Sequence, residues 1–187
     1  HNVLTENECQ QFIQMSEEMG YSPAPLSILG GDFQHAQISS ETKQLRDSWR
    51  VLCDMPESAV VSKRVREFLD KEVNVQEDDW VLCPDAPVNP RWRFNRYDKG
   101  QKFGPHFDAG YTKNRNEKTL FTFIIYLNEG YDGGETKFFP GGKRYYYEKE
   151  PTVQEVTITP RTGMALVFYQ AGNLNHRHEG APVLGDQ

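Results

Sequence analysis

The sequence lacks an apolar run long enough to cross a lipid bilayer. The longest such run, Leu120 to Leu127, suits a buried strand, whereas a membrane-spanning helix needs about 20 apolar residues. Low-complexity tracts and internal repeats are also missing, and no linker divides the chain. With 187 residues, the chain is expected to form one domain with a sizeable core.

Cysteine is scarce, and the sequence has no acceptor site for N-linked glycosylation. Cys9, Cys53 and Cys83 are odd in number and widely spaced, so neither a disulfide framework nor a zinc site is expected. Both features favour an intracellular protein. The sequence begins at His1 rather than at an initiator methionine, and the compartment is therefore left open.

The net charge of -6 disfavours nucleic acid as the main partner, because phosphate contacts need a basic surface. The charge is uneven, however: between Arg91 and Lys118 eight basic residues face three acidic ones, which gives this segment a charge of +5. The ordinary explanation is a solvated strand edge and loop. The functional explanation is an electropositive mouth that attracts an anionic substrate or cosubstrate.

Two helices are predicted in the first half of the chain. Thr5 and Glu8 have the spacing of a capping box, and Gly20 suits the end of the helix that follows. A second helix is expected from Pro56 to Lys71, where apolar residues recur at helical spacing. Residues 21–44 are rich in Ser, Gly and Pro and are expected to form loops with short strands.

After Pro90 the pattern changes to short strands separated by Gly or Pro. The predicted strands are Arg91–Tyr97, Thr119–Asn128, Thr136–Phe139, Val153–Ile158, Met164–Tyr169 and a segment around His176–Val183. Strands without helices between them indicate an antiparallel sandwich or barrel. The fold class is therefore α+β, mainly β.

The strongest chemical signal is the pair His106 and Asp108, two residues apart on an extended segment, where both side chains point to one face. A third ligand would have to come from another strand. His176 and His178 are the candidates, and because they are also two apart, side-chain alternation does not choose between them. Two histidines and a carboxylate on one face of an octahedron leave three positions open, as a non-haem Fe(II) centre requires.

The region from Arg93 to Val183 resembles the prolyl-4-hydroxylase-like branch of the 2-oxoglutarate/Fe(II) oxygenases. The resemblance is carried by short pieces that stand in the family's order. These pieces are Tyr97-Asp98-Lys99-Gly100, His106-Phe107-Asp108, Tyr126-Leu127-Asn128, Gly133-Gly134-Glu135-Thr136, the segment from Gly163 to Phe168, and His178 followed by Pro182-Val183.

The resemblance implies a double-stranded β-helix, or jelly roll, with supporting N-terminal helices. Residues 1–187 would form one dioxygenase domain, in which 1–90 are a helical support and sheet extension and 91–187 are the jelly-roll core. The C-terminal strand of the family would lie beyond Gln187. The spacing of the family's distal histidine to Pro-Val selects His178 over His176, which completes a metal site of His106, Asp108 and His178.

The resemblance also implies Fe(II), 2-oxoglutarate as cosubstrate and O2, with ascorbate as a further candidate cofactor. Tyr126 and Thr136 match hydroxyl donors to the far carboxylate of 2-oxoglutarate, and Tyr97 is a further pocket candidate. Phe103 stands where some prolyl hydroxylases have a tyrosine, so that hydroxyl is missing here. The family's basic anchor lies about ten residues beyond the distal histidine, past the last residue given; Arg161 and Arg177 are the weaker alternatives within the chain.

The expected function is therefore oxidative decarboxylation of 2-oxoglutarate coupled to hydroxylation of an unactivated C–H bond, on a proline of a peptide or protein. A dioxygenase acting on a small metabolite, an inactive jelly-roll binding module and a zinc hydrolase are the alternatives. A nucleic-acid demethylase is disfavoured by the acidic balance. The loop from Ala109 to Lys118 directly follows the first two ligands and is expected to act as a mobile lid.

Overall fold

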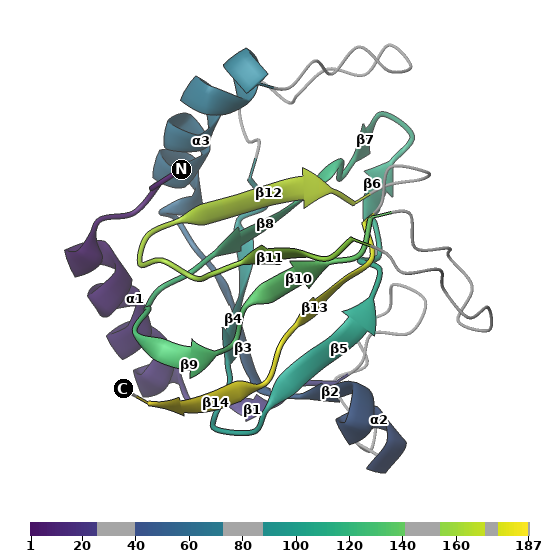
Figure 1. Ribbon diagram of the computed structural model, residues 1–187. Helices are drawn as coiled ribbons and strands as arrows, with labels where there is room; N and C mark the ends of the chain where they lie inside the picture. The colour runs from purple at the N-terminus through teal and green to yellow at the C-terminus, as the bar shows by residue number, and fades with distance from the viewer. Residues whose placement is uncertain (26–39, 73–87, 141–153, 171–175, 187) are drawn as a thin grey trace.

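A computed structural model describes residues 1–25, 40–72, 88–140, 154–170 and 176–186 (Figure 1). Within these ranges the protein is mainly β, with helices confined to the first half of the chain. The predicted fold class is confirmed in this respect. No helix in the described ranges is both long enough and apolar enough to span a bilayer.

The elements of the first half combine three helices with four strands. They are α1 (Glu6–Met19), β1 (Ser22–Pro23), α2 (Ser40–Leu45), β2 (Arg46–Asp47), β3 (Trp49–Asp54), α3 (Ser58–Glu72) and β4 (Arg91–Arg96). In the second half, the residues that the structure describes form strands but no helix. They are β5 (Lys102–His106), β6 (Thr112–Asn114), β7 (Glu117–Lys118), β8 (Phe121–Ile125), β9 (Tyr131–Gly133), β10 (Thr136–Phe138), β11 (Val156–Ile158), β12 (Ala165–Tyr169), β13 (His178–Gly180) and β14 (Val183–Asp186).

All strand pairs among the described residues are antiparallel. The largest sheet has the order β11-β10-β13-β5-β2, and β8 pairs separately with β12. A three-stranded sheet, β1-β3-β4, extends the structure next to the helices, and α1 and α3 lie on one side of the strands (Figure 1). This order brings β5 and β13, which are far apart in sequence, into direct contact.

The first helix begins and ends where the sequence predicts. Thr5 Oγ1 accepts a hydrogen bond from the Glu8 backbone N–H, and Glu8 accepts one from the Thr5 backbone N–H, which completes the capping box. Gly20 ends the helix with a φ of 79°, a conformation that a residue without a Cβ adopts at little cost. Phe12 is buried, whereas Met19 at the last turn is 47% exposed.

The main core lies between the helices and the strands. It joins Phe12 of α1 and Val65 of α3 to Phe94 of β4 and Ala165 of β12, all of them buried. Phe12 and Phe94 also contact Trp92 through tilted or edge-on ring packing. The helices therefore cover one side of the strands and help to hold the barrel's shape.

The loops predicted for residues 21–44 need one correction, and residues 26–39 lie outside the described ranges. Residues 21–44 do contain the short strand β1, but Ser40 to Leu45 form a helix rather than a loop. A Cβ added at Gly104 of β5 would lie only 3.2 Å from Leu45 Cδ1, so tertiary packing against β5 holds this helix. Cys9 and Cys53 are free thiols, and Cys83 lies outside the described residues.

Candidate metal centre

Two neighbouring strands and the segment that follows one of them bring the predicted metal ligands together. His106 is the last residue of β5, Asp108 follows two residues later, and His178 is the first residue of β13. His106 and His178 are direct cross-strand partners in the antiparallel pairing of β5 with β13. Opposite residues in an antiparallel pair project to the same face, so the sheet register places both imidazoles beside Asp108.

The three side chains converge on one point. His106 Nε2 lies 3.5 Å from Asp108 Oδ1, and His178 Nε2 lies 3.7 Å from Asp108 Oδ2. The candidate ligand atoms of all three residues lie within 4.8 Å of one another. A single metal ion bound at about 2.0–2.2 Å from each atom fits such a cluster.

Backbone carbonyls fix the orientation of both rings. Gly104 O lies 2.8 Å from His106 Nδ1, and His176 O lies 3.0 Å from His178 Nδ1. With Nδ1–H donating to a carbonyl, Nε2 of each ring is the unprotonated nitrogen and carries the lone pair that binds a metal. Support of this kind for the second ring nitrogen is typical of histidine ligands.

The electrostatic environment keeps the carboxylate charged and the imidazole neutral. Burial alone would raise the pKa of Asp108, but His106, His178 and Thr122 outweigh it and lower this pKa to about 2. Burial, followed by the charge of His106, lowers the pKa of His178, although Asp108 opposes this. A charged carboxylate and a neutral imidazole are the protonation states that bind a metal.

Thr122 of β8 supports the cluster from the facing layer. Its hydroxyl donates a hydrogen bond of 2.6 Å to Asp108 Oδ2. This orients the carboxylate and stabilises its charge. The sequence analysis missed this residue, because a threonine 14 positions from its partner carries no local signal beyond its place in an alternating strand.

The structure separates the two candidate distal histidines. His178 is 3% exposed and faces the cluster. His176 is exposed, and its backbone carbonyl oxygen contacts the His178 ring. The strand begins at His178, so its side-chain alternation does not extend back to His176.

The residues predicted to bind the cosubstrate fall into two groups. Tyr126 Oη and Thr136 Oγ1 are 2.7 Å apart and share a hydrogen bond. Thr136 is buried, and burial raises the pKa of Tyr126, so both hydroxyls remain neutral donors at neutral pH. Tyr97 directly follows β4 and lies near Arg46, Ser48 and Asp108. Burial raises its pKa, which the positive charge of Arg46 opposes.

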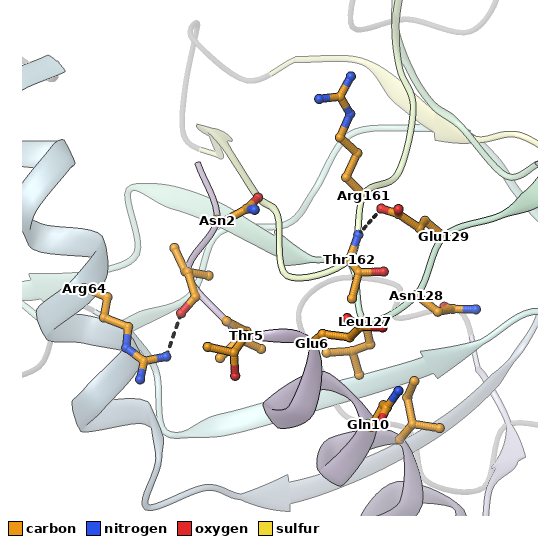
Figure 2. A pocket seen from close by; sticks show the side chains of 13 residues that line it. Asn2, Thr5, Glu6, Gln10, Arg64, Leu127, Asn128, Glu129, Arg161 and Thr162 are labelled. Atoms are coloured by element: carbon orange, nitrogen blue, oxygen red, sulfur yellow. Dashed lines mark hydrogen bonds between the residues drawn. The ribbon is translucent and has the colours of Figure 1, made fainter.

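Arg161 lies at the other end of β8 from the metal cluster. Gly163, two residues after Arg161, donates its backbone N–H to the carbonyl oxygen of Tyr126, just after β8 ends. Thr122, near the start of β8, contacts Asp108 at the metal cluster. Arg161 instead lines a pocket of about 1160 Å³ between the N-terminal segment and the loop after β8 (Figure 2). Arg177 places its guanidinium over the Phe139 ring.

A stacked arrangement that sequence reasoning missed adjoins the cluster. The Phe103 ring stacks on the His106 ring, with centroids 3.6 Å apart and planes 14° from parallel. The guanidinium of Arg46 lies over the Phe103 ring, 4.4 Å from the ring centroid. Residues 103 and 106 would face opposite sides of a regular strand, but a register shift in the pairing of β5 with β13 turns them to the same side.

Comparison with known families identifies the chain. Residues 92–187 match the model of the 2OG-Fe(II) oxygenase superfamily, and this chain belongs to that superfamily. The match covers the strands that carry the predicted ligands, and the resemblance drawn from the sequence motifs is confirmed.

Curated relatives include prolyl 4-hydroxylase 13 of Arabidopsis thaliana, which is 28% identical over 90% of this chain and 57% of its own length. Probable prolyl 4-hydroxylase 3 of the same plant is 26% identical, over 98% of this chain and 63% of its own length. The chain therefore spans roughly three-fifths of the length of these two relatives.

Solved structures show the same fold at lower identity. A prolyl-4-hydroxylase from Pseudomonas putida superposes with a TM-score of 0.56 and 17% identity, over 97% of this chain and 83% of the other. An oxidoreductase of the 2OG-Fe(II) oxygenase family from Burkholderia pseudomallei gives 0.55 and 18%, over 98% and 76%. The double-stranded β-helix predicted from the sequence is confirmed as the fold.

Proposed function

We propose that this chain is the catalytic part of a 2-oxoglutarate- and Fe(II)-dependent dioxygenase that hydroxylates an unactivated C–H bond. His106, Asp108 and His178 are the proposed metal ligands. The observation that carries the proposal is the convergence of these three side chains, with each histidine held through Nδ1 by a backbone carbonyl. An arrangement that fixes both rings and half-buries the carboxylate suits metal binding.

The donor set fits Fe(II). His106, Asp108 and His178 would hold the ion through two imidazole nitrogens and one carboxylate, a donor set typical of Fe(II) sites that react with O2. When bound, the iron would supply oxidative chemistry with O2 and 2-oxoglutarate, and ascorbate is proposed as an auxiliary reductant. The protein's own part is to hold the ligands in place, to orient the cosubstrate and to keep water out.

We propose that Tyr126 and Thr136 bind the far carboxylate of 2-oxoglutarate. Their hydroxyls lie 2.7 Å apart, and each can turn its proton toward a shared anionic ligand. The two strands that position them, β8 and β10, also lie next to the metal cluster: Thr122 of β8 contacts Asp108, and Phe138 of β10 pairs with His178. A cosubstrate bound to the metal can therefore extend toward this hydroxyl pair.

A peptidyl proline is the proposed target, and it rests on the curated relatives that are named as prolyl 4-hydroxylases. We also propose that residues 1–187 act as one domain, since the main core joins α1 and α3 to strands from both halves of the chain. Tyr97, which lies beside Arg46, is proposed as a further residue of the cosubstrate pocket.

The test is turnover by the full-length protein with Fe(II), 2-oxoglutarate, O2 and a set of proline-containing peptides. We expect succinate from the native protein, and we expect His106→Ala to lose about 99% or more of it, because a missing ligand removes the metal chemistry. His176→Ala is the matched control, since it removes an exposed imidazole from the same segment.

A native protein that releases no succinate with any peptide would contradict the dioxygenase assignment. Succinate release without peptide hydroxylation would keep the dioxygenase class and reject the proposed target. Loss of activity in His176→Ala but not in His178→Ala would reassign the third ligand.

A further inference from the structure

Arg46 is a buried cation that forms no ion pair with the residues that the structure describes. It lies in β2 at the edge of the five-stranded sheet and is 8% exposed. Its Nε donates to Ser48 Oγ at 3.2 Å, and its Nη2 donates to Asn95 Oδ1 at 2.9 Å. Both acceptors are neutral. Among the residues that the structure describes, no carboxylate lies within ion-pair distance of this guanidinium.

The guanidinium lies next to the proposed metal site. It rests 4.4 Å from the centroid of the Phe103 ring, which in turn stacks on the proposed ligand His106 at 3.6 Å. Only one aromatic ring therefore separates the cation from a metal ligand. A molecule bound over this site with an anionic group on the β2 side would meet the guanidinium directly.

A buried charge without a counter-ion is costly, because burial removes its hydration. Burial lowers the pKa of Arg46, Tyr97 opposes this, Arg93 adds to it, and Asp108 opposes it. Metal coordination would neutralise Asp108 and leave Arg46 with less compensation. The structure thus keeps a desolvated guanidinium, whose planar fork matches a carboxylate, beside the site where a substrate would bind.

The sheet register separates this guanidinium from the proposed hydroxyl pair for 2-oxoglutarate. Thr136 pairs with Gly180, Gly180 with Phe103, and Phe103 with Arg46. Two strand spacings, about 10 Å in total, lie between Thr136 and Phe103, over which the guanidinium rests. One carboxylate cannot contact two groups that far apart, so an anion bound at Arg46 would differ from the carboxylate bound at Thr136.

We propose that Arg46 is the cation of a second carboxylate subsite, which binds a carboxylate on the molecule to be hydroxylated. This inference rests on the proposed function and gives the substrate a chemical class: it is acidic close to the reacting carbon. The carboxylate can belong to a peptide, as an acidic side chain or a free C-terminus, or to a small organic acid. Asn95 and Ser48 hold the guanidinium in position through its other donors.

The experiment measures binding rather than turnover. Two probe pairs are titrated calorimetrically, without O2, into full-length protein that carries Mn(II) and saturating 2-oxoglutarate. The first pair is N-acetylproline and its amide, and the second is a capped proline peptide with glutamate or glutamine after the proline. The protein variants are the native form, Arg46→Gln, Arg46→Lys and Asn95→Asp.

The native protein should bind at least one acid about tenfold more tightly than its neutral partner. Arg46→Gln should bind both members of the pair equally, and Arg46→Lys should keep part of the preference because it keeps the charge. Asn95→Asp retains Arg46 and its packing but adds a carboxylate next to Nη2. An internal ion pair should then remove the preference in a folded protein, which a purely structural role for Arg46 does not predict.

Three results would overturn the inference. One is equal affinity of the native protein for acid and amide in both pairs, or no binding of either acid. Another is a full acid preference in Arg46→Gln or in Asn95→Asp. The last is a loss of about tenfold or more in the affinity of Arg46→Gln for 2-oxoglutarate, with the preference for the acid probe unchanged. This would show that Arg46 binds the cosubstrate instead. Failure of the native protein to bind 2-oxoglutarate or to form succinate would instead count against the proposed function itself.

Discussion

Thr122 and Asp108 are joined by a hydrogen bond of 2.6 Å that links the β8–β12 layer to the metal cluster beside β5 and β13. Because Asp108 stands after the end of β5, the strand itself does not fix its side chain. The threonine hydroxyl supplies that restraint. The geometry of the candidate site therefore depends on a residue that would not itself bind the metal.

Thr122→Val tests this dependence. The substitution keeps the size and β-branching of the side chain but removes the donor, so Asp108 loses its orienting partner. We expect affinity for Mn(II), measured by calorimetry, to fall about tenfold or more. Thr157→Val, at an exposed position of β11, is the control and should leave the affinity unchanged. Equal metal affinity in both variants would show that Thr122 does not support the site.

The two histidines of the C-terminal segment should behave differently. His178→Ala removes a buried side chain that faces the cluster, and we expect metal affinity to fall by about a hundredfold or more. His176→Ala removes an exposed ring but leaves the backbone carbonyl that contacts His178 Nδ1. Its metal affinity should stay within about threefold of the native value. The reverse order of effects would exclude His178 as the ligand.

Gly163 is required by the close approach of the N-terminal segment. A Cβ at this position would lie 2.1 Å from Leu4 O, and the residue has a φ of +78°. Its carbonyl also accepts hydrogen bonds from Val3 N and Leu4 N. Gly163→Ala should therefore lower the free energy of unfolding by about 3 kcal/mol or more, through the clash and the strained backbone together.

Gly100→Ala is the matched control in the same urea denaturation experiment. Gly100 also has a positive φ, +84°, but nothing lies within 4 Å of an added Cβ. We expect only the backbone cost there, about 1–2 kcal/mol. Similar losses of unfolding free energy in the two variants would show that the close contact with Leu4 is not the reason why a glycine is needed at position 163.

Glu8 should make stability depend on pH. The hydrogen bond from Arg64 is the largest cause that lowers its pKa from 4.5 to about 2. A carboxyl group whose pKa is lower in the folded state contributes stability above its unfolded pKa, and this contribution is lost as pH falls through the folded value. The pair is partly exposed, so its contribution is about 1 kcal/mol at most.

Urea denaturation of the native protein and Glu8→Gln between pH 6 and 3 measures this contribution. The native protein should be more stable at pH 6, and the difference should shrink as pH falls below 4.5 toward 2. Glu6→Gln removes a charge from the same helical turn and controls for the helix dipole. A difference between native protein and Glu8→Gln that does not change with pH would exclude the proposed ion pair.

Local sequence patterns predicted the features that depend on residues close together in the sequence. The capping box at Thr5 and Glu8 fixed the start of α1, and the spacing of His106 and Asp108 placed two side chains on one face. The choice of His178 as a metal ligand rested on a family resemblance and stays a prediction. The structure buries this side chain and places it opposite His106.

Contacts between distant strands were not predictable in the same way. Phe103 faces the same side as His106 only because of an irregularity in the strand pairing, which alternation alone does not reveal. Arg46 precedes Asn95 by 49 positions, and its segment carried no motif. The role proposed for Arg46 depends on the pairing of β2 with β5, which no local sequence pattern reveals. The expected mobility of the loop from Ala109 to Lys118 stays a prediction, since the structure shows only its short β6–β7 hairpin.

The central claim is that the chain couples 2-oxoglutarate decarboxylation to hydroxylation by O2. The most direct measurement is mass spectrometry of the products formed under 18O2 by the full-length protein with Fe(II), 2-oxoglutarate and a proline peptide. We expect one 18O atom in succinate and one in the hydroxylated product, and neither product with His106→Ala. Products that carry only solvent oxygen, or no succinate at all from the native protein, would contradict it.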